Sequence, residues 1–117
     1  MTKDEAEAVK WFHKAAESGE AKAWNALAWI LATSENSAIR DGANAVAFAE
    51  RAVAATNRKT PADLDTLAAA YAEAGQFEKA VPTEQEAIAL VQTAAEKNDY
   101  TTRLKLFEAH VPYRAKG

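Results

Sequence analysis

Apolar residues between positions 60 and 91 follow two helical stripes that a short turn separates. The first stripe has the i, i+3, i+4, i+7 spacing of one helix face and consists of Leu64, Leu67, Ala68 and Tyr71. The second keeps helical spacing and consists of Phe77, Ala80, Val81, Ala87, Ile88 and Val91. Because the turn at Ala74-Gly75-Gln76 is so short, the two stripes must pack on each other, and the sequence predicts two antiparallel helices.

The ends of this predicted hairpin carry residues that start and stop helices. Thr60 offers a hydroxyl cap, and Pro61 suits the first helical position, where no amide donor is needed. Asp63 places an acid in the first turn, and Gly75 supplies the backbone freedom that ends the helix. Pro82 lies inside the second helix, where it removes an amide donor, so we expect a kink without a break.

A short pattern of small and branched residues occurs three times along the chain. Its copies begin at residues 8, 45 and 80, and each repeats itself after seven residues, a spacing that returns to one helix face. Periods of this length are typical of arrays of helical hairpins. In front of two copies, a stripe of Trp24, Leu27, Ala28 and Leu31 matches the stripe of Leu64, Leu67, Ala68 and Tyr71. The sequence therefore predicts one domain over 1–117, divided into a half repeat (2–18), a repeat with a long turn (20–57), a second repeat (60–97) and a capping helix (98–111).

Three departures from a regular array are expected. Thr2 and Glu5 have the spacing of a capping box, so the array opens on the second helix of a pair and leaves one end uncovered. About five residues are inserted between 33 and 41, which predicts an irregular turn. Glu84 and Ala49 stand where a large apolar residue would fill the layer, so we expect thin or wet packing there.

Composition supports an all-α domain. The chain has 117 residues, 49% of them hydrophobic and 26% charged, and its 30 alanines outnumber 4 glycines and 3 prolines. It contains no cysteine, and its net charge of −3 gives no general attraction to nucleic acid. No signal peptide and no run of about 18 apolar residues is visible, so we expect a cytoplasmic protein with no membrane partner.

The spacing, turn and helix pairing of residues 65–81 strongly resemble a tetratricopeptide (TPR) repeat, with its large, small and aromatic positions at Leu64, Leu67, Ala68 and Tyr71. The stretch 4–23 is more similar to the related SEL-type repeat. Pro112-Tyr113-Arg114 resembles the tails that follow such arrays in some bacterial proteins. The resemblance implies a right-handed α-solenoid of about six helices that binds a protein or peptide, and it does not indicate which one.

On this resemblance, the first helices of each pair (22–33 and 61–74) and the last helix would line a concave groove. The positions expected to face it are Lys22, Asn25, Trp29, Asp65, Ala69, Ala72, Glu73, Thr102, Arg103 and Leu106. Relatives that hold a C-terminal carboxylate use lysine, asparagine and arginine in the groove. Because Asp65, Ala69 and Glu73 accompany Asn25 here, the sequence argues against that clamp.

Three aromatic residues have two interpretations each. Trp29 is off the apolar stripe of its helix, so it is either an anchor for a bound peptide or a residue that packs on the 34–41 turn or a neighbouring helix. Trp11 and Phe12 point about 100° apart on one helix, so both cannot be buried against one neighbour. One of them is either a cover for the core or an exposed patch for self-association.

No catalytic or cofactor motif is visible. His13 and Glu17 are one helical turn apart, which provides two ligands on an exposed helix and so a poor metal site. Acid pairs such as Asp63 with Asp65 are two residues apart and point in different directions. We therefore expect that the protein binds no metal or cofactor and is not an enzyme. The leading hypothesis is a peptide-binding adaptor, and the alternative is a homodimer formed through Trp11 and Phe12.

Overall fold

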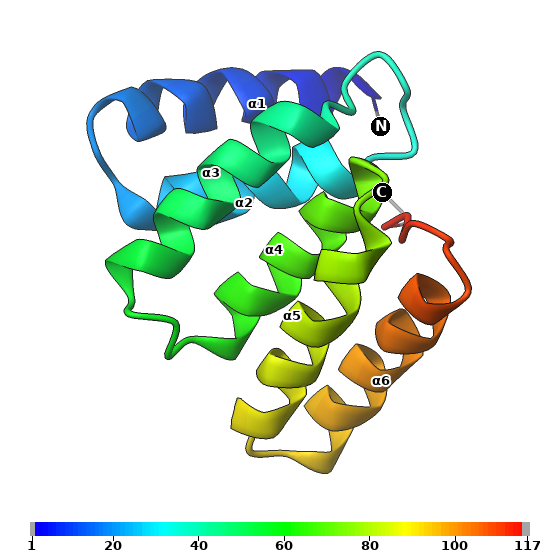
Figure 1. Cartoon of the computed structure of the whole chain (residues 1–117). Coiled ribbons are helices and arrows are strands. Elements are labelled where there is room, and N and C mark those ends of the chain that lie inside the picture. Colours follow the sequence, from blue (N-terminus) through cyan, green and yellow to red (C-terminus); the bar gives the residue numbers. More distant parts are fainter. Residues whose placement is uncertain (1, 116–117) are drawn as a thin grey trace.

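The computed structural model describes residues 2–115, with side chains from Glu5 onward, and within that range every regular element is an α-helix (Figure 1). The helices are α1 (Thr2–Glu17), α2 (Ala21–Thr33), α3 (Gly42–Ala55), α4 (Pro61–Glu73), α5 (Phe77–Leu90) and α6 (Ala94–Glu108). The predicted all-α class is thus confirmed. No described helix has the length and apolarity needed to span a membrane.

Consecutive helices run in alternating directions and pack on each other in chain order, from α1 on α2 to α5 on α6 (Figure 1). The exception to simple chain order is α2, which contacts α4 as well as α3. As a result α4 has helices on several sides, and residues 63–70 are all buried. Small side chains allow the helices to pack this closely around α4. The closest approach is at Gly42, where a Cβ would lie 3.0 Å from the backbone of Ala74.

Four helices end in the same backbone motif. The second residue after each helix has a positive φ: Gly19 (87°), Asn57 (55°), Gly75 (81°) and His110 (61°). In each case the next amide bonds the carbonyl five residues earlier, for example Gln76 N–H to Tyr71 O at 2.8 Å and Val111 N–H to Leu106 O at 2.9 Å. These are the bonds of a Schellman motif, which turns the chain back sharply.

The helix after the second pair begins earlier than expected. The boundary predicted at residues 97 and 98 falls inside α6, because α5 ends at Leu90 and Thr93 caps α6. The Thr93 hydroxyl oxygen accepts from Glu96 N–H and the hydroxyl lies 3.1 Å from the Glu96 carboxylate. This Thr-x-x-Glu spacing was the sequence signal for the true start.

Two other residues were predicted to cap helices, Thr60 and Thr2. Thr60 occupies the N-cap position of α4, but its side chain makes no capping hydrogen bond. The side chain of Thr2 lies outside the described residues, and Glu5 accepts a hydrogen bond from Ser34 Oγ at 2.6 Å. As expected, the loop at 34–41 is irregular, and Pro82 leaves α5 continuous.

Candidate functional site

An open hollow of about 330 Å³ lies where α2, α4 and α6 meet. We call it the α2/α4/α6 hollow, and its lining residues are Asn25, Ala26, Trp29, Ala62, Asp65, Thr66, Tyr100 and Arg103. Four of the residues expected in the groove, Asn25, Trp29, Asp65 and Arg103, are therefore brought together on one surface. Burial and the nearby carboxylate of Asp65 raise the pKa of the Tyr100 phenol to about 12, so this wall of the hollow keeps its proton at neutral pH.

Arg103 is at the centre of this surface. Its Nε and Nη2 atoms each donate to one oxygen of Asp65 at 2.8 Å, a bidentate pair that joins α6 to α4. Burial alone would lower the pKa of Arg103, but the bonds to Asp65 and the attraction of Asp65 and Glu84 raise it. The guanidinium also faces three aromatic rings, with centroids 5.0 Å away for Tyr100, 5.2 Å for Tyr113 and 5.6 Å for Trp29.

Glu84 of α5 lies beneath this ion pair and is fully buried. No donor bonds to either of its carboxyl oxygens, and the nearer one is 4.0 Å from Arg103 Nε. Burial, and then the hydrogen bond that the protonated acid shares with Asp65, raise the pKa of Glu84 to about 10. The layer expected to be thinly packed or wet therefore holds a neutral carboxylic acid at neutral pH.

The C-terminal tail, residues 111–115, folds back beside the hollow. The ring of Tyr113 lies 5.7 Å from that of Trp29, and Arg114 Nη1 lies 2.8 Å from Glu73 Oε1. Ala115 N–H donates to the carbonyl of Thr33 at 2.9 Å. The tail therefore contacts α2 through Trp29 and Thr33 and α4 through Glu73, next to the α2/α4/α6 hollow.

The other residues predicted to face the groove do not line the α2/α4/α6 hollow. Ala69 and Ala72 are only 1% and 2% exposed, so the prediction that they face the groove is wrong. The reason is that α4 is surrounded, so its off-stripe positions meet other helices or the tail. Lys22 and Thr102 are exposed outside the lining of the hollow, and Leu106 packs against the core. Glu73 lies at the tail, where Arg40 Nε is 3.4 Å away.

The three aromatic residues with two interpretations differ in their exposure in the structure. Trp29 is half-buried and packs against the core and beside Arg103 of α6, as the second interpretation expected. Its ring also meets Tyr113, a contact that neither interpretation included. On α1, Phe12 packs against the core, whereas Trp11 is 66% exposed with Lys14 Nζ 5.5 Å from its ring centre. Whether Trp11 mediates self-association stays a hypothesis.

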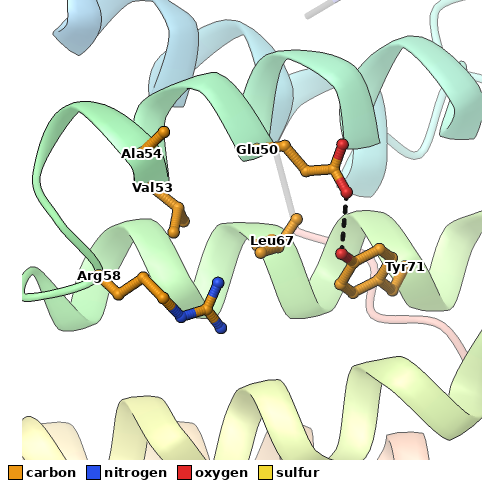
Figure 2. A pocket seen from close by; sticks show the side chains of 6 residues that line it. All are labelled: Glu50, Val53, Ala54, Arg58, Leu67 and Tyr71. Carbon is orange, nitrogen blue, oxygen red and sulfur yellow. Dashed lines mark hydrogen bonds between the residues drawn. The ribbon is translucent and has the colours of Figure 1, made fainter.

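A second hollow of about 230 Å³ opens between α3 and α4 (Figure 2). Its polar groups are already engaged, since Tyr71 OH donates to Glu50 at 3.0 Å and Arg58 binds Glu86 at 2.9 and 2.7 Å. Burial first, and then Glu50, raise the pKa of Tyr71. Within the described residues no three His, Asp or Glu side chains are grouped to hold a metal ion, and the ring of His13 lies edge-on to Phe48.

Over residues 2–115 these features define a six-helix all-α fold with a polar-aromatic surface shared by α2, α4 and α6. Comparison with family models, with curated proteins and with solved structures gives no match.

Proposed function

We propose that the chain is a TPR-like right-handed α-solenoid whose concave face binds a peptide or protein segment without catalysis, and that it needs no nucleic acid, metal or cofactor. The α2/α3 and α4/α5 hairpins would be its two full repeats, α1 its half repeat and α6 its cap. The contact between α2 and α4, the first helices of successive pairs, supports this arrangement. The observation that carries the binding role is the α2/α4/α6 hollow.

The chemistry of the hollow suits a peptide. Trp29 and Tyr100 provide aromatic surface, and aromatic residues dominate the energetics of protein interfaces. The side-chain oxygen of Asn25 is buried and lacks a hydrogen-bond partner, so it is available to a backbone or side-chain donor. Because Arg103 and Asp65 hold α6 against α4, these groups are positioned before binding, and little ordering entropy opposes it.

Filling the hollow is expected to abolish this binding. Ala62 is exposed at its edge, so Ala62→Trp fills the space from the surface and spares the core. Peptides are selected from a displayed random library on the immobilised wild-type chain and then measured by isothermal titration calorimetry. We expect their affinity for Ala62→Trp to be at least about tenfold weaker than for the wild type.

The matched control is Ala47→Trp, which adds the same side chain at an exposed position of α3. Peptides that bind all three proteins equally would place the binding site elsewhere. A library that yields no binder would count against a peptide-binding role altogether.

Trp11 favours self-association as a second candidate function. This candidate predicts that the protein dimerises at high micromolar concentration and that Trp11→Ala makes it monomeric, with light scattering as the measurement. One tryptophan provides about 250 Å² at most, whereas a stable interface takes about 800 Å² per partner, so Trp11 ranks below the hollow. A monomeric wild-type chain would exclude it.

A further inference from the structure

The path of the tail 111–115 is fixed where α6 ends. His110 has a φ of 61°, in the left-handed region, and its ring stacks on that of Phe77 with centroids 4.9 Å apart and planes 4° apart. A residue with a Cβ is disfavoured in that region, so the stack helps to hold the turn. Pro112 then prevents the helix from continuing. The chain is thereby directed back toward α2 and α4 (Figure 1).

Three different kinds of contact hold the tail. Tyr113 supplies an aromatic ring that meets Trp29 and the guanidinium of Arg103. Arg114 supplies a cation for the carboxylate of Glu73. Ala115 supplies a main-chain N–H for the carbonyl of Thr33, which belongs to the last turn of α2 and has no helical partner of its own.

These contacts are those by which a groove recognises a short bound segment: an aromatic anchor, a charge pair and a backbone hydrogen bond. We propose that the tail is a resident ligand of the binding face, and that the partner is a protein segment carrying the same aromatic-then-basic pair. The partner displaces the tail and places its own ring on Trp29 and its own cation on Glu73. This inference rests on the proposed function, because it specifies the partner of the same face.

A tethered tail competes strongly with any free segment. A short tether gives an effective concentration in the millimolar range, so a free segment of equal intrinsic affinity meets an occupied site in the wild-type chain. The apparent affinity of the free segment equals its intrinsic affinity multiplied by the fraction of molecules whose site is open. Removing the side chains of Tyr113 and Arg114 from the full chain therefore exposes the site to a free peptide.

The test uses an amidated, fluorescently labelled peptide, Val-Pro-Tyr-Arg-Ala, which copies the tail. The fluorescence anisotropy of this peptide is measured as the wild-type 117-residue chain, or the double variant Tyr113→Ala/Arg114→Ala, is added. We expect the double variant to bind at least about tenfold more tightly than the wild type, and the control variant Val111→Ala, at an exposed tail position, to bind like the wild type. Adding Glu73→Gln to the double variant should remove most of the gain.

Circular dichroism first shows that each variant is folded, and Arg114→Ala alone, with an intermediate gain expected, serves if the double variant is not. Equal binding to wild type and variant would overturn the proposal, as would equal binding of peptides with Tyr→Ala or Arg→Gln. A dimeric wild type that the double variant turns into monomers would also overturn it, since the tail would then occupy a second copy. The tail peptide could fail to bind the double variant while library peptides still bind Ala62→Trp more weakly than the wild type. That result would refute only the identity of the partner and not the proposed function.

Discussion

Arg103→Met is expected to lower the free energy of unfolding by about 3–5 kcal/mol, because it leaves the buried carboxylate of Asp65 without its partner. Asp65 is only 5% exposed, and Arg103 is the cation that donates to each of its two carboxylate oxygens. Methionine keeps much of the volume and the contact with Trp29 and Tyr100. The effect therefore reports the lost charge pair more than lost packing, and urea unfolding followed by circular dichroism measures it.

The chain contains a matched control in a second bidentate pair. Arg58 binds Glu86 with the same geometry, but their side chains are 50% and 39% exposed, against 12% and 7% for Arg103 and Asp65. Arg58→Met should change the free energy of unfolding by no more than about 1 kcal/mol, since water solvates the remaining acid. Asp65→Leu combined with Arg103→Met should recover most of the loss, because no unpaired charge remains. Similar losses from both single variants would contradict this account.

Sequence periodicity was sufficient for the all-α class and for the hairpin at 60–90, but not for the boundary between α5 and α6. The hairpin at 60–90 is predictable because its stripes, its proline and Gly75 are all local signals. Asn25, Trp29, Asp65 and Arg103 were among the off-stripe positions that the resemblance to TPR repeats implied, but the same choice included Ala69 and Ala72, which are buried. The start of α6 was local as well, in Thr93 and Glu96, but the preceding alanine-rich stretch carries no break that would end α5 early.

The contacts that give the site its character were not predictable in this way. Asp65 and Arg103 are 38 residues apart, and nothing in the local pattern pairs them. An alanine-rich helix such as α4 shows little difference between its faces, so the burial of Ala69 depends on the helices packed around it. The tail at 111–115 has no periodicity, and its contact with Trp29 depends on the turn at His110. Pro112 followed by Tyr113 was the available hint.

Glu84 makes the stability of the fold dependent on pH in the direction opposite to that of an ordinary acid. In the unfolded chain its carboxyl titrates near the ordinary value of 4.5, whereas in the folded chain its pKa is raised to about 10 by burial and by Asp65. Below pH 4.5 the Glu84 carboxyl is protonated in both the folded and the unfolded chain, so its full contribution to the free energy of unfolding is present. Between the two values only the unfolded chain releases it, so stability falls as pH rises, by at most about 1.4 kcal/mol per pH unit.

Glu84→Gln removes this titration while it keeps the volume and an N–H donor for Asp65. From pH 5.5 to 8.5 we expect the wild type to lose up to about 4 kcal/mol more of its free energy of unfolding than the variant does, measured by urea unfolding at both values. Glu86→Gln, two residues along α5, is the control. Arg58 lowers the pKa of Glu86 through their hydrogen bonds, so its contribution is lost only in acid, below its unfolded value, and its removal leaves the slope above pH 5.5 unchanged. If Glu84→Gln retains the wild-type slope, Glu84 is ionised in the folded protein, and the pair of Arg103 with Asp65 must then be described as a three-charge cluster in which Arg103 serves both acids.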